Sequence, residues 1–299
     1  KLKKIKTISN FSLRSFFNLM KPRVMSLVLF TSMVGLLIAP EQVSFTTSAI
    51  SLFAVAMGAG AAGALNMWYE SDLDALMSRT CLRPIPTGKV QKNQALWFGT
   101  VLSIISISML YYTANLVSSL LLATTIGFYF FIYTIWLKRR TPQNIVIGGA
   151  AGALPPVIGW AISTNSISIE SIILFLIIFI WTPSHFWALS LYKSSDYKKA
   201  KIPMLPITSG IKKTKLNILI YSLLMTPIVA LPYFFNFGSL IYLILSSAMT
   251  FYYVYLCMLL FKEKNTKISN IIARRIFVYS IFYLFFIFVL ILADNVIQY

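Results

Sequence analysis

The sequence predicts an all-α polytopic membrane protein, in which nine transmembrane helices form one bundle with a central cavity open to the cytoplasmic side. Of its 299 residues, 58% are hydrophobic and 11% are charged, which is too apolar for a domain with a water-facing surface. Nine apolar windows have about the 20 residues that a helix needs to cross a bilayer. Every lysine and arginine lies before the first window or in alternate connections between windows.

The nine windows follow one another with short connections, and we treat residues 1–299 as a single membrane domain. Two of them contain runs of small residues, "GAGAAGAL" and "GGAAGALPPVIGW", which favour close helix packing inside a bundle. The windows cover approximately residues 24–39, 46–69, 94–113, 116–136, 143–163, 168–192, 216–235, 238–261 and 276–297.

The basic residues predict the orientation of the chain. Seven precede the first window, and the others number four in 70–93, three in 137–142, seven in 193–215 and five in 262–275. These five segments lie on one side of the membrane if all nine windows cross it. Lysine and arginine in short loops stay on the cytoplasmic side. The N-terminus is therefore expected in the cytoplasm, with the basic tail 1–20 on the membrane surface. A bacterial plasma (inner) membrane is the expected location.

The basic residues have two alternative interpretations. An organellar inner membrane is kept open, since the acid-free tail also resembles a short transit peptide. The net charge of +18 is explained by topology and by attraction to anionic lipid, so a nucleic-acid partner gains no support.

An internal repeat relates the two acidic loops, residues 70–93 and 193–215. A shift of 122 residues places Asp74 on Asp196 and brings "PIPTG" onto "PITSG". Each loop follows an even-numbered window, so the two repeat units have the same orientation and can face each other across a bundle. We expect the two acidic ends to meet at one cavity.

Helical spacing divides the carboxylates of the first loop. Asn66, Glu70 and Asp74 recur at every fourth residue and would form one stripe, whereas Asp72 points away. Stacked carboxylates repel unless a cation neutralises them, and such oxygen ligands suit Mg²⁺ bridged to phosphates. We therefore expect Mg²⁺ as the cofactor.

Basic side chains beside both acidic stripes would hold phosphate oxygens. In a membrane cavity this arrangement points to a lipid-tailed diphosphate, whose C–O bond ionises as pyrophosphate leaves. The candidate residues are Arg79 and Arg83 in the first loop, and Tyr192, Lys193, Lys198 and Lys199 in the second.

The segment "NMWYESDLDALMSRT" resembles the N-x-x-x-D-x-x-x-D signature of the UbiA-type intramembrane prenyltransferases. Further matching blocks occur at 21–31, 77–90, 133–160 and 181–207, and they resemble the heme-modifying branch of that family. The last three windows match only in hydropathy.

The resemblance implies a nine-helix enzyme that joins the farnesyl group of farnesyl diphosphate to a vinyl group of protoheme IX (heme B). Water is added in the reaction, and heme O and pyrophosphate are the products. A heme A synthase is a candidate partner.

The resemblance also implies roles for particular residues. Asn66, Glu70, Asp74 and Asp196 would hold Mg²⁺ and the diphosphate; the phosphate oxygens would be bound by Arg23, Arg79, Arg83 and Lys138.

This chain departs from the family pattern at two positions. Glu70 stands where the family usually has Asp, and Ser195 stands where many relatives carry a second Asp before Asp196. These departures bear on the geometry of the metal site rather than on the class of reaction.

His185 is the single histidine of the chain, and it lies about three helical turns deeper than Asp196. It has two interpretations, a packed histidine bonded to a neighbouring helix or a contact to the porphyrin iron. The aromatic run from Phe128 to Tyr133 is similarly either a wall for the farnesyl chain or a packing surface.

Two other functions share features with this sequence. A UbiA-type prenyltransferase could instead act on a quinone precursor or another aromatic acceptor, but the block "WTPSHFWAL" resembles the heme-modifying branch. A secondary transporter could also carry internal repeats. Transporters usually place ionisable residues near the middle of the membrane, whereas these acids lie at its edge.

Overall fold

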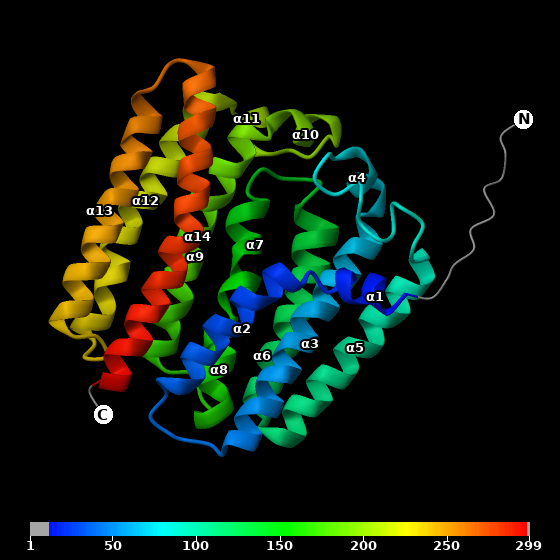
Figure 1. Cartoon of the computed structure of the whole chain (residues 1–299), viewed down its shortest axis with the longest axis vertical. Coiled ribbons are helices and arrows are strands. Elements are labelled where there is room, and N and C mark those ends of the chain that lie inside the picture. The colour runs from blue at the N-terminus through cyan, green and yellow to red at the C-terminus, as the bar shows by residue number, and fades with distance from the viewer. Residues whose placement is uncertain (1–11, 298–299) are drawn as a thin grey trace, which may run out of the picture.

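The computed structural model describes residues 12–297, and helices are the regular secondary structure in that part of the chain, which contains no strand. The long helices run side by side as one bundle (Figure 1). In chain order the elements are α1 Leu13–Leu19, α2 Pro22–Leu37, α3 Phe45–Tyr69, α4 Ser71–Leu76, α5 Lys92–Thr113, α6 Leu116–Gly127, π-helix η1 Phe128–Leu137, α7 Asn144–Ala153, α8 Pro155–Thr164, α9 Ile169–Tyr192, α10 Ser194–Lys199, α11 Leu205–Thr208, α12 Gly210–Phe234, α13 Leu240–Lys262 and α14 Thr266–Ile297.

The first of the nine expected spans is the least regular. Within the described residues, eight spans are long and apolar enough to cross a membrane, and a ninth exists if α1 and α2 count as one bent span. The two helices meet at 60° because Lys21 adopts a left-handed conformation (φ 55°) and Pro22, which lacks an N–H, begins α2. With 16 residues, α2 is about 24 Å long, shorter than the hydrocarbon core.

Two other spans contain irregular segments that the windows did not predict. The span of residues 144–164 is interrupted at Leu154, immediately before Pro155 and Pro156, whose nitrogens cannot continue the hydrogen-bond ladder. The span that begins with α6 continues as the π-helix η1, whose wider turn carries the aromatic run.

The helix boundaries correct two expected connections. Helix α14 begins at Thr266, ten residues before the ninth window, so Arg274 and Arg275 are helical rather than part of a loop. Helix α12 likewise begins at Gly210 instead of 216. Charged residues in the first turns of these helices lower the mean hydropathy there, so the two hydropathy windows begin too late.

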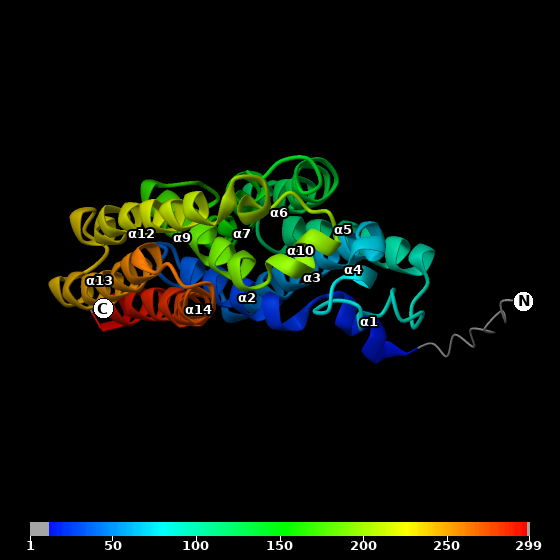
Figure 2. The same cartoon turned by 90° about the horizontal axis from the view of Figure 1, so that it is seen from above.

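The bundle is held together by close approaches between helices. A Cβ on Gly35 of α2 would lie 2.1 Å from the carbonyl oxygen of Pro156 in α8, and one on Gly159 would lie 1.8 Å from that of Ser32. Small residues therefore allow these two backbones to touch, as is common between membrane helices. Seen from above, α3, α5 and α6 form one side of the bundle and α12, α13 and α14 the other (Figure 2).

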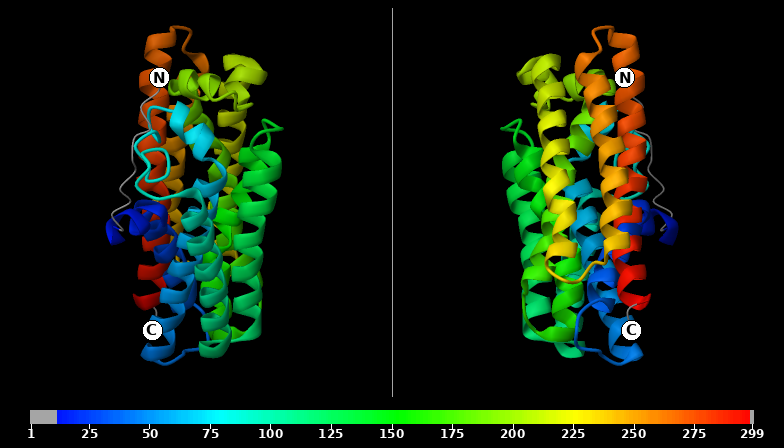
Figure 3. Two further views of the ribbon diagram at one scale, coloured as in Figure 1. Left: turned by 90° about the vertical axis from the view of Figure 1, so that its right-hand side faces the viewer. Right: turned by 90° about the vertical axis from the view of Figure 1, so that its left-hand side faces the viewer.

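The short helices α4, α10 and α11 lie together at one end of the bundle (Figure 1). Helices α4 and α10 lie there with the α13–α14 connection, whereas α14 ends at the opposite end (Figures 1 and 3). The two acidic loops predicted to face each other are therefore at the same end of the molecule.

Candidate functional site

The first acidic segment lies at a break between two helices. Helix α3 ends at Tyr69, α4 begins at Ser71, and Glu70 joins them with φ −93° and ψ 10°. The expected stripe is therefore not one continuous helix. The helical bond pattern nevertheless crosses the break, because the Glu70 N–H donates to the Asn66 carbonyl (2.9 Å) and the Asp74 N–H donates to the Glu70 carbonyl (2.8 Å).

Burial separates the members of this segment as the spacing suggests. Asn66, Glu70 and Asp74 are each at most 3% exposed. The side chain of Asp72 is 54% exposed. Three polar groups are thus enclosed at the end of α3, while the fourth faces outward.

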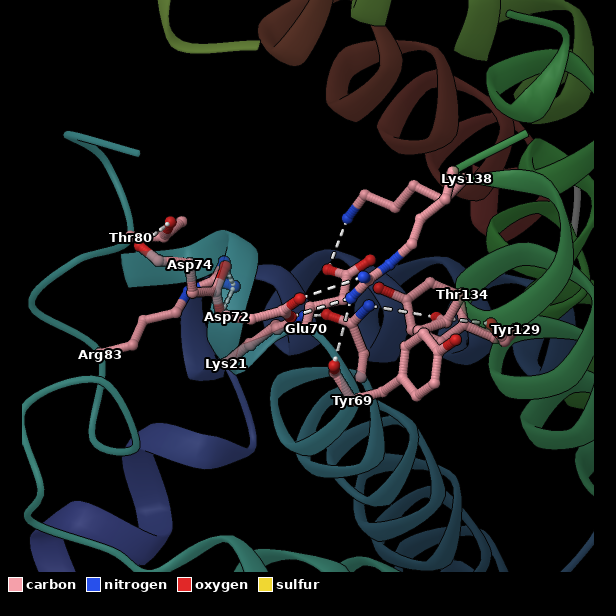
Figure 4. A network of polar contacts seen from close by, with 12 residues as sticks. Lys21, Tyr69, Glu70, Asp72, Asp74, Thr80, Arg83, Tyr129, Thr134 and Lys138 are labelled. Atoms are coloured by element: carbon pink, nitrogen blue, oxygen red, sulfur yellow. Dashed lines mark hydrogen bonds and ion pairs between the residues drawn. The ribbon is translucent and has the colours of Figure 1, made fainter. Parts of the chain in front are cut away.

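Each of the three buried groups has a cationic partner (Figure 4). Lys21 Nζ donates to Asn66 Oδ1 at 2.5 Å, and Lys138 Nζ donates to Glu70 Oε2 at 2.5 Å. Arg83 Nη1 lies 2.8 Å from both carboxylate oxygens of Asp74. Positive charge therefore already neutralises this segment.

The π-helix η1 supplies the wall of the site opposite α3. The amide of Asn66 donates to Thr134 Oγ1 at 3.1 Å, and Thr134 donates in turn to the Tyr129 carbonyl five residues earlier (2.9 Å). The ammonium of Lys21 lies 5.9 Å from the Tyr129 ring centre, and that of Lys138 lies 5.6 Å from the Tyr133 ring centre. The wider π-turn thus presents polar and aromatic groups to the same two lysines.

The aromatic run divides between the site and the outside of the bundle. Tyr129 and Tyr133 face the site lysines, with ring centres 5.3 Å apart. Phe130 is buried against Trp68, and Phe131 is 61% exposed. The packing interpretation is therefore confirmed for Phe130, whereas a role of Tyr129 and Tyr133 as a wall for the farnesyl chain stays a prediction.

The exposed Asp72 forms a separate ion pair with Arg139, through bonds of 2.9 and 3.0 Å. Partial burial raises the pKa of Asp72, but the hydrogen bonds from Arg139, the backbone N–H groups and the positive charge of Arg139 together outweigh it and hold that pKa below its ordinary value. The same hydrogen bonds raise the pKa of Arg139. This pair fixes α4 to the end of η1 and lies outside the buried network.

The second acidic segment contacts the first through a neutral hydroxyl. Asp196 lies in the first turn of α10 and is 7% exposed. It accepts a hydrogen bond of 2.6 Å from Ser78, which follows α4 in the first loop. Among the described residues Asp196 has no cationic partner, so the two halves of the site differ in charge balance.

The backbone shows the repeat as well. Gly88 and Gly210, which the 122-residue shift superimposes, have positive φ angles of 73° and 83°. This left-handed conformation favours glycine. The two loops therefore share a turn as well as a sequence motif.

The other expected phosphate-binding residues lie around the same end of the bundle. Arg79 is exposed, and Lys193 and Tyr192 are half-buried, with Tyr192 packed edge-on against Phe277. Arg79 and Lys193 have no ion-pair partner in the part of the chain that the structure describes. Arg23 lies in α2, but its side chain is outside the described residues.

His185 is packed between two helices. Its ring stacks on Trp181 (centres 4.3 Å apart) and on Phe277 (4.6 Å), and its Nδ1 lies 2.6 Å from Ser280 Oγ. The expected bond to a neighbouring helix is therefore present. That bond engages only one of the two ring nitrogens.

The donor set is compatible with Mg²⁺. Glu70 Oε1 is buried and has no hydrogen-bond partner within the described chain, which leaves one oxygen free to bind a cation. No three acidic, histidine or cysteine side chains converge on a point within residues 12–297. Mg²⁺ needs no such protein cage, because it commonly uses one or two carboxylates together with substrate phosphates.

The expected central cavity stays a prediction. An open pocket of about 480 Å³ lies beside the first loop, and none of the four buried site residues lines it. Its lining residues are Ser71, Asp72, Ile85, Pro86, Gly88, Val90, Gln91 and Lys92.

Three residues at this end were not singled out from the sequence: Lys21, Ser78 and Thr134. Lys21 directly precedes the proline that opens the first span, and this position was the available signal. No sequence pattern marked Ser78 or Thr134, because each meets its partner through tertiary structure or through the π-helical turn.

Curated relatives match almost the whole chain. Protoheme IX farnesyltransferase of Pelagibacter ubique (strain HTCC1062) is 63% identical over 296 residues, which cover 99% of this chain and 98% of that protein. The enzyme of the same name from Ehrlichia ruminantium (strain Gardel) is 51% identical, and the match covers 94% of each chain.

Solved structures share the fold. Digeranylgeranylglyceryl phosphate synthase superimposes with a TM-score of 0.78 at 20% identity, over 94% of this chain and 99% of that one. A UbiA homolog from Archaeoglobus fulgidus, bound to GPP and Mg²⁺, superimposes with a TM-score of 0.65 at 16% identity, over 93% and 99%. The model of the UbiA prenyltransferase family matches residues 28–281. The chain is thus a multi-pass membrane protein that belongs to the UbiA prenyltransferase family.

Proposed function

We propose that this chain transfers the farnesyl group of farnesyl diphosphate to a vinyl group of protoheme IX, with addition of water, to give heme O and pyrophosphate. The observation that carries the proposal is the 63% identity, over nearly the full length of both chains, to a protein named protoheme IX farnesyltransferase. The block around His185 favours heme over a quinone precursor as the acceptor.

The diphosphate is proposed to bind where the two acidic segments meet. Arg79 and Lys193, which lack ion-pair partners among the described residues, would bind phosphate oxygens first, with Tyr192 and Arg23 beside them. Arg83 and Lys138 would then exchange a carboxylate partner for a phosphate oxygen. Such charge-assisted bonds stabilise the negative charge that develops on the leaving pyrophosphate.

Asn66, Glu70, Asp74 and Asp196 would hold Mg²⁺ together with the diphosphate. The ion supplies positive charge that stabilises the leaving group when it is bound. Release of Lys138 and Arg83 to the phosphates would free the oxygens of Glu70 and Asp74 for this role, and Glu70 Oε1 is already unpartnered within the described chain.

Lys21 is proposed to balance charge at the same place. It bonds to Asn66 and lies over the Tyr129 ring, so it can reach a phosphate oxygen by a change of rotamer. The rings of Tyr129 and Tyr133 would shield the allylic cation that remains after pyrophosphate leaves, since aromatic faces attract cations and exclude water.

We further propose a bacterial inner membrane, with the N-terminus, the acidic segments and the opening of the substrate cavity on the cytoplasmic side. The distribution of lysine and arginine supports this orientation. Heme B is proposed to contact His185, and a heme A synthase is the proposed partner that takes up the product.

The test is a reaction of the purified protein with farnesyl diphosphate, Mg²⁺ and either heme B or hydroxybenzoate. Mass spectrometry should detect heme O with heme B as the acceptor and no prenylated product with hydroxybenzoate. Prenylated hydroxybenzoate, or pyrophosphate release with no dependence on heme, would refute the assignment. Omission of Mg²⁺ in the presence of a chelator should stop both product formation and pyrophosphate release.

A further inference from the structure

The ring of His185 is held in one position by four contacts. Trp181 and Phe277 stack on its two faces with interplanar angles of 20° and 26°, and Phe186 meets it edge-on at 84°. The fourth, polar contact joins Nδ1 to Ser280 Oγ of α14. The imidazole therefore cannot turn without disturbing both stacks.

The hydroxyl of Ser280 determines which ring nitrogen carries the proton. Ser280 Oγ lies 2.7 Å from the Phe277 carbonyl and 2.6 Å from His185 Nδ1. A serine hydroxyl has one hydrogen, and a carbonyl can only accept. The hydrogen must point to Phe277, since two bare oxygens at 2.7 Å would repel each other. Toward His185 the same oxygen is then an acceptor, and Nδ1 must be the donor.

This assignment leaves a lone pair on Nε2. In a neutral imidazole one nitrogen donates and the other accepts, so an Nδ1–H tautomer has an unprotonated Nε2. Within residues 12–297, no group forms a hydrogen bond to that nitrogen, although His185 is only 7% exposed. A bare imidazole nitrogen whose partner nitrogen donates to a fixed acceptor is the usual arrangement of a histidine that binds a metal.

We propose that Ser280 is a positioning residue, which fixes His185 in the Nδ1–H tautomer so that Nε2 can bind the iron of the heme substrate. This inference rests on the proposed function, because it takes heme as the acceptor. Ser280 acts only through His185 and does not touch the reacting atoms.

A second contact holds Ser280 independently of its hydroxyl. Trp181 Nε1 donates to the Ser280 backbone carbonyl at 2.9 Å. Because this bond does not involve the side chain, a Ser280→Ala protein keeps the link between α9 and α14 and loses only the acceptor for Nδ1. Ser280→Thr retains the hydroxyl and is the conservative variant.

Ser190 provides a matched control. It is fully buried on α9 and donates to the Trp187 carbonyl three residues earlier at 2.9 Å, as Ser280 does to Phe277. Among the described residues it forms no hydrogen bond with a histidine. Ser190→Ala therefore removes a comparable buried serine without altering His185.

The experiment measures binding of heme B to the full chain in lipid nanodiscs by its Soret band. Resonance Raman spectroscopy of the ferrous complex then reports the iron–histidine stretch. We expect Ser280→Ala to weaken heme binding by about 10–100-fold and to shift the iron–histidine stretch. Ser280→Thr should restore both, and Ser190→Ala should leave both unchanged.

The outcomes separate this inference from the proposed function. Loss of the iron–histidine signal in His185→Ala, with Ser280→Ala identical to the unmodified protein, would overturn the role of Ser280 alone. An iron–histidine signal that persists in His185→Ala would overturn the ligand role, and with it this inference, while heme O production could continue. Absence of heme O from the unmodified protein would refute the proposed function itself.

Discussion

The two acidic segments are related by the repeat, yet they balance their charge in different ways. In the first, Asp74 accepts two bonds from Arg83 and Glu70 pairs with Lys138, so its buried carboxylates are already neutralised. In the second, Asp196 accepts only a hydroxyl hydrogen bond from Ser78 within the described chain. A buried carboxylate without a counterion is costly, so Asp196 is the position most in need of an added cation.

This difference indicates how the site could be assembled. The first segment offers one unpartnered oxygen, Glu70 Oε1, but its other carboxylate oxygens would have to lose cationic partners before they could bind a metal. The second segment needs no such exchange. Substrate phosphates can take over the displaced Arg83 and Lys138. Binding of diphosphate and metal would then be mutually dependent. The metal would displace Arg83 and Lys138 from the carboxylates, and the phosphates would supply these two cations with new acceptors.

The largest effect is expected from Asp74→Asn. The substitution removes both a proposed metal ligand and the charge that holds Arg83, so it should lower heme O production by at least about 100-fold. It should also lower the free energy of unfolding by about 1.5–3 kcal/mol, since the hydrogen bonds from Arg83 lose their charged acceptor. Product is measured by mass spectrometry and stability by thermal unfolding in detergent. Near-normal turnover would place the metal site elsewhere.

Asp196→Asn should separate activity from stability. Turnover should fall to a similar extent, because the carboxylate that has no counterion among the described residues is lost. The free energy of unfolding should change by less than about 1 kcal/mol, because the asparagine oxygen still accepts the bond from Ser78. Destabilisation as large as that of Asp74→Asn would show that the two segments are equivalent after all.

Ser78→Ala tests the contact between the two halves. Loss of the hydroxyl leaves Asp196 without its protein partner in the described chain, and turnover should fall by about 10-fold, in the range found for groups that orient metal ligands. Thr87→Ala is the matched control in the same loop, because Thr87 donates only to the nearby carbonyls of Arg83 and Pro84. Equal turnover of the two variants would show that the Ser78 contact has no part in the reaction.

Much of the fold was predictable because membrane spans follow from hydropathy alone. The windows located every long helix. The repeat of "PIPTG" as "PITSG" also pointed to two similar turns, and the final glycines of both motifs have positive φ angles. The break at Lys21 and Pro22 was not predicted, although a proline at that position is a known helix start.

The candidate site was predictable only in part. Charge and spacing located Asn66, Glu70, Asp74 and Asp196, and separated them from the exposed Asp72. The lysine that bonds to each buried polar group could not be derived from the sequence. Lys21 is 45 residues from its partner Asn66, and Lys138 is 68 residues from its partner Glu70. The π-helix that orients Thr134 has no recognised sequence signal, since it differs from an α-helix only in hydrogen-bond register.

The smallest effect is expected from Asp72→Asn, which removes the exposed ion pair with Arg139 and leaves the buried network intact. Its cost in stability at neutral pH should be below about 1 kcal/mol, because the Asp72 side chain is 54% exposed and solvent screens the pair.

The hydrogen bonds from Arg139 lower the pKa of folded Asp72, so the ion pair stabilises the protein above the pKa of the unfolded carboxyl. This stabilisation is lost as the pH falls through the lower pKa of the folded state. Thermal unfolding at neutral pH and at a series of acidic pH values should therefore show the stability of the variant and that of the unmodified protein approaching each other as the pH falls. A difference in stability that persists in acid would mean that the ion pair with Arg139 is not its cause. A loss of turnover comparable to that of Asp196→Asn would mean that Asp72 takes part in binding the metal or the diphosphate.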